Sequence, residues 1–128
     1  MAPGVDQKDV VIAFIRRYEI IEKFGAEAPE ADNLFWCLDA IDAAGRNDPE
    51  IGLELIQKIL EGTTNQYVLA NLAAGPLESL LVRSGAAIID KIEARARHSE
   101  RFRQLLKGVW RNRIDEGVWT RLQNAFKA

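Results

Sequence analysis

The sequence has one cysteine and one histidine among its 128 residues, and these scarcities exclude several classes of protein. Because Cys37 has no partner in the chain, it cannot form an intramolecular disulfide, so the sequence does not predict a secreted disulfide scaffold. Because His98 is the only imidazole, a two-histidine metal site cannot form in one chain. We expect no metal and no other cofactor.

Long apolar runs are also missing. The longest uncharged stretch, Gly62 to Leu77, has sixteen residues and includes five polar side chains, so it is too short and too polar to span a bilayer. The opening residues 1–6 lack the basic segment followed by an apolar run that is typical of a signal peptide. We expect a cytoplasmic protein with no membrane partner.

Residues that carry out catalysis are scarce as well. A serine or cysteine nucleophile would need His98 as its base, but no serine lies in a strained glycine-flanked turn. Cys37 lies among large apolar neighbours. The carboxylate pairs Asp39 with Asp42 and Glu50 with Glu54 share helix surfaces and are expected to be solvated. The sequence therefore predicts a protein that is not an enzyme.

The residues that are present indicate an all-α fold. Hydrophobic residues make up 48% of the chain, and they recur at helical spacing with no alternating strand pattern. The length fits one domain over residues 1–128, with an N-terminal helix and loop over 1–30, a core over 31–114 and a C-terminal helix over 115–128.

Capping residues, prolines and glycines predict where the helices begin and end. Asp6 or Asp9, Asp32, Asp48 and Ser99 are expected to cap helices. Glycines at 25, 45, 62 and 85 and the Gly75-Pro76 pair are expected to end them. The resulting helices cover about 7–24, 33–44, 49–61, 65–74, 77–83, 86–97, 100–110 and 115–126.

Short connections between these helices predict antiparallel neighbours. The second and third, fourth and fifth, and sixth and seventh helices would form hairpins, stacked as in a short HEAT-like array. No residue pattern recurs at a fixed period, so an irregular helical bundle is the alternative. The uncharged helix over 65–74 is the expected centre of the fold.

Two short motifs carry a resemblance to a known family. The block Ala74-Gly75-Pro76-Leu77-Glu78 is followed about thirty residues later by Gly108-Val109-Trp110. In these residues and their apolar neighbours, the stretch from Leu34 to Trp110 resembles a small, uncharacterised, all-helical bacterial domain family of unknown function. The resemblance implies a bacterial source and a HEAT-like fold, and it implies no reaction.

Charge divides unevenly along the chain. Residues 1–64 hold six basic and thirteen acidic side chains, whereas residues 65–128 hold eleven basic and six acidic ones. Seven cations lie between Arg95 and Arg113, where Glu100 is the only acidic residue. Four of them are expected to form an outward ridge opposite the apolar face of one helix. The ridge residues are Arg97, Arg101, Lys107 and Arg111, and Arg103 joins them as a candidate partner-binding residue.

Three tryptophans complete the candidates for a binding surface. Trp110 and Trp119 lie on apolar helix faces and are expected in the core. Trp36 either packs under the first helix or stands exposed as an interaction hot spot.

These features favour a non-enzymatic protein-interaction domain. Its partner would be another protein with an acidic surface, or a second copy of the chain, and by analogy an immunity or antitoxin protein would suit such a fold. Nucleic-acid binding through the stretch from Arg95 to Arg113 is the alternative. A lack of exposed aromatic residues for base stacking counts against that alternative.

Overall fold

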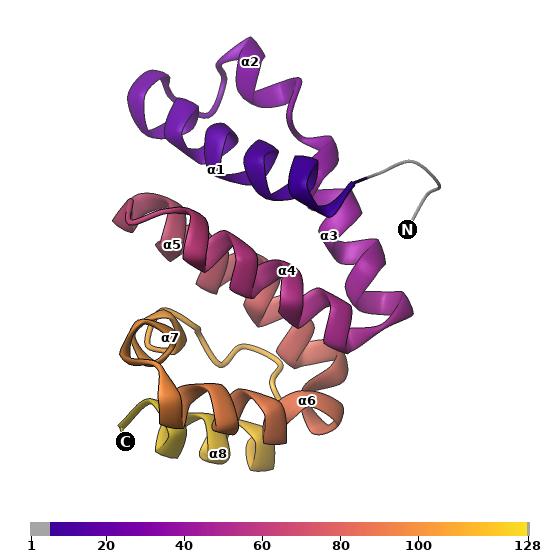
Figure 1. Ribbon diagram of the computed structural model, residues 1–128, viewed down its shortest axis with the longest axis vertical. Helices are drawn as coiled ribbons and strands as arrows, with labels where there is room; N and C mark the ends of the chain where they lie inside the picture. Colours follow the sequence, from indigo (N-terminus) through magenta and orange to yellow (C-terminus); the bar gives the residue numbers. More distant parts are fainter. Residues whose placement is uncertain (1–5, 128) are drawn as a thin grey trace.

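The computed structural model describes residues 6–127, and these residues form helices joined by loops, with no strand among them (Figure 1). The all-α class is confirmed. The helices are α1 (Gln7–Phe24), α2 (Pro29–Asp32), α3 (Trp36–Asn47), α4 (Pro49–Gly62), α5 (Gln66–Leu72), η1 (Ala73–Leu77), α6 (Glu78–His98), α7 (Glu100–Leu106) and α8 (Glu116–Lys127).

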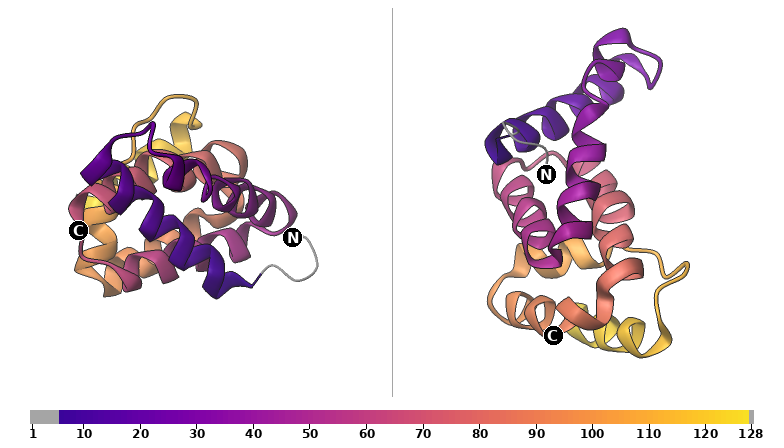
Figure 2. Two further views of the ribbon diagram at one scale, coloured as in Figure 1. Left: turned by 90° about the horizontal axis from the view of Figure 1, so that it is seen from above. Right: turned by 90° about the vertical axis from the view of Figure 1, so that its right-hand side faces the viewer.

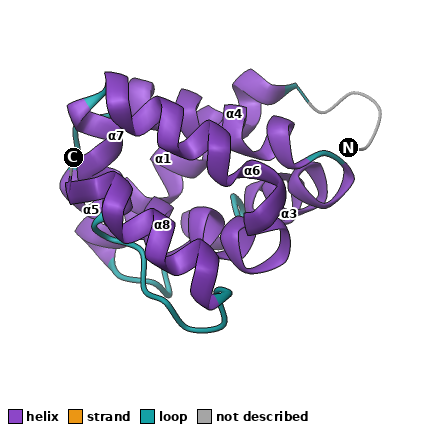
Figure 3. Cartoon of the chain, turned by 90° about the horizontal axis from the view of Figure 1, so that it is seen from below, coloured by secondary structure: helices purple, strands orange, loops and turns teal. Residues whose placement is uncertain are grey.

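The helices follow one another along the long axis of the molecule. Helices α1 and α2 lie at one end, α4 and α5 lie in the middle, and α7 and α8 lie at the other end (Figures 1 and 2). Helix α3 packs extensively on α4, and α6 packs extensively on α8. Figure 3 views the end that α6, α7 and α8 form. Segments near in sequence therefore stay near in space, so the charge division along the chain becomes a division between two ends.

The predicted helix starts at Asp6, Asp48 and Ser99 are confirmed. The carboxylate of Asp48 accepts a hydrogen bond of 3.0 Å from the Glu50 backbone N–H, and the Ser99 hydroxyl accepts one of 3.1 Å from the Phe102 N–H. Such caps satisfy N–H groups that have no partner within the helix. At the end of α1, Gly25 has a φ of 94°, a conformation that favours glycine.

The predicted boundaries of the second helix are wrong. Asp32 lies in the short helix α2, and α3 begins later, at Trp36, without a side-chain cap. Gly45 does not end α3, which continues to Asn47. Instead, Gly45 is buried where α3 meets α4: a Cβ atom added to Gly52 would lie 2.9 Å from the Gly45 Cα. The two glycines therefore permit a close helix contact.

The predicted break at Gly75-Pro76 is also wrong, because α5 continues through η1 into α6. The break predicted near Gly85 is confirmed in part, because the backbone leaves helical geometry at the preceding residue, Ser84. Pro76 has no N–H to donate, and the chain accommodates it in the wider π-helical turn η1. Gly85 faces α8, where an added Cβ would lie 2.9 Å from a Val118 methyl carbon. Only Ser84, with φ −135° and ψ 21°, marks a kink in α6.

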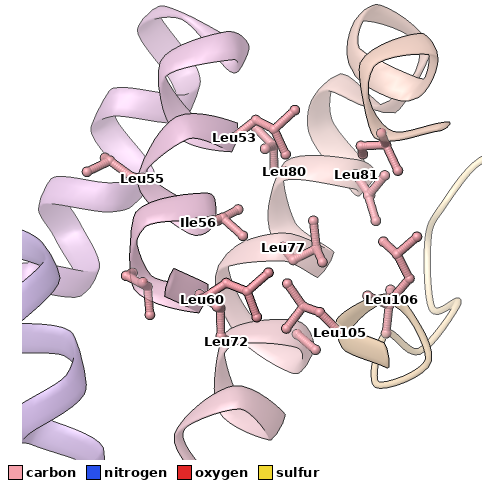
Figure 4. Close-up of a cluster of buried hydrophobic side chains, with 14 of the residues drawn as sticks. Leu53, Leu55, Ile56, Leu60, Leu72, Leu77, Leu80, Leu81, Leu105 and Leu106 are labelled. Atoms are coloured by element: carbon pink, nitrogen blue, oxygen red, sulfur yellow. The ribbon is translucent and has the colours of Figure 1, made fainter. Parts of the chain in front are cut away.

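The core is rich in leucine and isoleucine, with Phe14 of α1 and Phe102 of α7. Figure 4 shows the part of it that α4, α5, η1, α6 and α7 form. Six residues of α4 are buried, whereas α5 buries Val68 and Leu72 and exposes Tyr67. The prediction that 65–74 is the central helix is therefore wrong, and α4 has that place. The hairpin expected of 65–74 with 77–83 is wrong as well, because both belong to one run, and HEAT-like stacking is not confirmed.

One helical run has the length and the apolar composition of a membrane-spanning helix. By length and composition, residues Gln66–His98 are apolar enough to cross a bilayer, with a mean hydropathy of 1.3 over the most apolar window. Leu77, Leu81 and Ile88 of this run pack in the core with at most 1% of their surface exposed, although Val82 is 39% exposed. The core helix of a folded domain has this character too.

Candidate interaction surface

The most exposed large hydrophobic residue in the described part of the chain is Trp110, with 72% of its surface accessible. The prediction that Trp110 is a core residue is wrong. Helix α7 ends at Leu106, so Val109 and Trp110 lie in the loop between α7 and α8 instead of on the apolar face of a helix. Val109 is buried in that loop, and Trp110 points away from the core. Trp119, in contrast, is partly buried against the core as predicted.

The loop that carries Trp110, residues 107–115, is fixed at several points; we call it the Trp110 loop. Val109 and Ile114 are 5% and 2% exposed and anchor it to the core. The Ile114 N–H donates a hydrogen bond of 2.8 Å to the Arg111 carbonyl. Between them, Asn112 has a φ of 43°, a left-handed conformation that asparagine tolerates better than most residues. The backbone therefore holds Trp110 in a defined position.

The two motifs that carry the family resemblance lie on either side of the contact between the Trp110 loop and the segment Ala73 to Glu78. The Asn112 side chain donates a hydrogen bond of 2.7 Å to the carboxylate of Glu78, the last residue of the Ala74–Glu78 block. Gly108 lies so close to η1 that an added Cβ would be 2.9 Å from the Ala73 Cβ. Both motifs were recognisable in the sequence, but no spacing rule links segments about thirty residues apart, so the contact between the Trp110 loop and the segment Ala73 to Glu78 could not be predicted.

Cations surround Trp110 in the chain, but they do not form the predicted ridge. Arg97 lies at the end of α6, Arg101 lies in α7, and Lys107 and Arg111 lie beyond its last residue. A single helical face cannot hold all four, because helix α7 covers only residues 100–106. The exposed cations of the Trp110 loop are Lys107, Arg111 and Arg113.

Arg101 and Arg103 make contacts that hold the fold. The Arg103 guanidinium donates a hydrogen bond of 2.5 Å to the Ala96 carbonyl in the last turns of α6, where carbonyls lack helical partners. The Arg101 guanidinium donates one of 2.6 Å to the Thr63 carbonyl, next to the end of α4. These two candidate binding residues therefore connect helix ends, although Arg101 stays exposed.

Ion pairs neutralise other cations in the C-terminal half. Arg83 pairs with Asp42, Lys91 with Glu50, and Arg121 with Asp90 and Glu93. The hydrogen bond from the Arg121 guanidinium holds the pKa of the Glu93 carboxyl below its usual value. Within residues 6–127, no ion pair neutralises Arg97, Lys107, Arg111 or Arg113. Within the C-terminal half, the cations without an ion pair therefore include all three of the Trp110 loop and Arg97 at the end of α6.

Trp36 lies on a different part of the molecule. It is the first residue of α3, at the end that α1 and α2 form, and 41% of its surface is exposed (Figure 1). Its neighbour Phe35 is 48% exposed, and the Arg17 guanidinium lies 5.4 Å from the Phe35 ring centre. The structure thus leaves Trp36 exposed, but it does not bring Trp36 together with the cations of the Trp110 loop.

Metal-ligating side chains are dispersed over the described residues. Within residues 6–127, no group of three or more histidine, cysteine, aspartate or glutamate side chains lies together. His98 is exposed at the last position of α6. Cys37 is fully buried, and this burial raises the pKa of its thiol to about 11.

We expect Cys37 to react with a disulfide reagent at pH 8 at least about 100-fold more slowly in the folded protein than in denaturant, because thiolate is scarce and the sulfur is covered. Stopped-flow absorbance of the thiolate that the reagent releases measures the rate of this reaction. Equal rates in the folded and denatured protein would show that Cys37 is accessible.

The raised pKa of Cys37 also predicts that the free energy of unfolding falls as the pH rises above the usual thiol range, since the unfolded chain then releases a proton that the folded chain keeps.

The fold and this surface together define an all-helical domain that displays a fixed aromatic residue among cations. Residues 25–128 match the family of unknown function DUF6869, and the chain belongs to that family. The matched range begins after α1 and includes both motifs and the whole Trp110 loop. No curated protein and no solved structure gives a significant match to the chain.

Proposed function

We propose that this protein is a non-enzymatic interaction domain that binds an acidic segment of another protein through the Trp110 loop. The observation that carries the proposal is the 72% exposure of Trp110 on a loop held by buried residues and a hydrogen bond to Glu78. Tryptophan and arginine are the residues that most often dominate protein interfaces. A loop that is ordered before binding loses little conformational entropy when the partner docks.

Charge supports an acidic partner. Lys107, Arg111 and Arg113 have no ion-pair partner within residues 6–127, so an acidic segment gains their attraction without breaking existing pairs. Such charges mainly accelerate association and select the partner, while burial of the indole ring supplies affinity. A second copy of the chain could offer its acidic end, and salt-dependent sedimentation distinguishes that case from a monomer.

Single-stranded nucleic acid is the second candidate ligand. The expected lack of exposed aromatic residues counted against this ligand, but Trp110 is exposed. A base stacked on an indole ring and phosphates bound by neighbouring arginines are a common combination. Against it, the acidic end of the molecule repels a long polyanion.

We expect Trp110→Ala to weaken binding of a short glutamate-rich peptide with a central phenylalanine by about 10- to 30-fold, the loss typical of a hot-spot residue. The melting temperature should stay nearly unchanged, because Trp110 buries little surface in the free protein. Fluorescence anisotropy of the labelled peptide measures affinity, and circular dichroism measures stability.

The matched control is Trp36→Ala, which removes a partly exposed tryptophan at the opposite end and should leave affinity unchanged. Arg113→Glu should weaken binding, whereas Arg16→Glu on α1 should not. A labelled oligothymidylate of similar length is titrated in parallel. Tighter binding of the oligonucleotide, lost in Trp110→Ala, would replace the proposal with nucleic-acid binding, and no binding of either probe would contradict both.

A further inference from the structure

A pocket of about 210 Å³ lies between α3, α4, η1 and α6. It is separate from the interaction surface, because no residue of the Trp110 loop lines it. Its walls are mainly apolar and come from different helices. They include Leu38 and Ile41 of α3, Ile56 of α4 and Leu80 of α6.

A few polar groups line the same pocket. The Arg83 guanidinium and the Asp42 carboxylate form an ion pair of 3.0 Å that joins α6 to α3, and both side chains are about one-third exposed. The hydroxyl-bearing residues Tyr18 and Ser79 complete the polar lining. Apolar walls with a small number of polar groups are the usual composition of a small-molecule site.

Several residues in the pocket wall lack side chains. Gly45, Gly52 and Gly75 all line it, and a Cβ atom added to Gly75 would meet nothing within 4 Å. The π-helical turn η1, which contains Pro76, forms another part of the wall. Single π-helical turns occur frequently at functional sites. Gly75-Pro76 thus gives the Ala74–Glu78 motif a second role, beyond the Glu78 contact with the Trp110 loop.

We propose that this pocket binds a small uncharged molecule, one aromatic ring or a branched aliphatic chain, with a single hydroxyl or amide group. The volume sets the size, since a cavity of about 150 Å³ accommodates benzene. The ion pairs set the charge: one Asp42 oxygen pairs with Arg83 and the other with Arg46, so a cationic ligand finds no free carboxylate oxygen, and an anionic ligand would have to compete with Asp42 for Arg83. A neutral hydroxyl or amide hydrogen-bonds to the Asp42–Arg83 pair instead.

Phenol is the probe for this site, and methyl ¹H–¹³C NMR spectra of the full chain report where it binds. We expect saturable shifts of the Ile41, Ile56 and Leu80 methyls, with Leu105 and Leu106 unaffected. Benzoate, of similar size but charged, should bind at least about tenfold more weakly, because it competes with Asp42 for Arg83. Shifts spread over all methyls, or equal binding of benzoate, would contradict the proposal.

Variants that fill the pocket provide the second test. Ser79→Phe, from the α6 wall, and Leu38→Trp, from the α3 wall, should each weaken phenol binding at least about tenfold. Ala87→Phe places the same ring on an exposed position of α6 outside the pocket and should have no effect. If phenol fails to bind but the phenylalanine-containing peptide shifts the pocket methyls, the pocket holds a partner's side chain and the small-molecule proposal is overturned.

Discussion

Replacing Gly52 by alanine should lower the free energy of unfolding by about 2 kcal/mol, the range for overpacking a core. In an exposed helix, the same change stabilises by up to about 1 kcal/mol through helix propensity. At Gly52 the steric effect wins, because the new methyl group would lie 2.9 Å from the Gly45 Cα. The obstacle is backbone, which no rotamer change can move aside, so α3 and α4 have to separate.

Urea denaturation of Gly52→Ala measures this loss, and Gly75→Ala is the matched control. A Cβ atom at Gly75 meets nothing within 4 Å, and its φ lies outside the left-handed region, so we expect unchanged or slightly higher stability there. Gly52→Val should lose more than Gly52→Ala. Equal stability of the two alanine variants would show that the helix contact is not tightly packed.

Capped helix starts were predictable from the sequence because the interaction that defines them is local. Asp48 and Ser99 accept hydrogen bonds from backbone groups two and three residues away. The end of α1 at Gly25 was predictable for a similar reason, because a positive φ is a property of a single residue. Local chemistry of this kind needs no knowledge of the tertiary fold.

Other glycines misled the prediction because a glycine serves two purposes that look the same in a sequence. Gly25 ends a helix through its backbone conformation, whereas Gly45 lies within α3 where α4 approaches closely. Gly85 combines the two purposes, because it follows the kink at Ser84 and also faces Val118 of α8. Which purpose applies depends on residues far along the chain, such as Val118 opposite Gly85. Without the fold, those neighbours were unknown.

The candidate surface was only partly predictable. The positive charge between Arg95 and Arg113 was evident, but continuing the helical period past Leu106 placed Trp110 in the core and the cations on one ridge. Helix α7 ends there because the chain turns to bury Val109 outside the helix. The hydrogen bond from Asn112 to Glu78, which orders the Trp110 loop, depends on a tertiary contact that no local pattern signals.

Phe102→Ala should have the largest effect on stability, a loss of about 3 to 5 kcal/mol, because truncating a buried phenylalanine removes apolar contacts and leaves a cavity. Phe102 has none of its surface exposed and belongs to the seven-residue helix α7. A helix of that length is not stable without tertiary packing. Removing the Phe102 ring should therefore also loosen α7 and the Trp110 loop that follows it.

Urea denaturation measures the global loss, and hydrogen exchange of the α7 and Trp110 loop amides measures the local one. Phe102→Leu keeps most of the buried volume and should lose only about 1 to 2 kcal/mol. These measurements are made at a temperature at which Phe102→Ala is still folded. If α7 anchors the Trp110 loop, the Val109 and Ile114 amides of this variant should exchange faster than in the unmodified protein, and the variant should bind the peptide more weakly, although Phe102 does not lie on the surface. Unchanged peptide affinity in folded Phe102→Ala would mean that the contacts to η1 and Glu78 suffice to hold Trp110 in place.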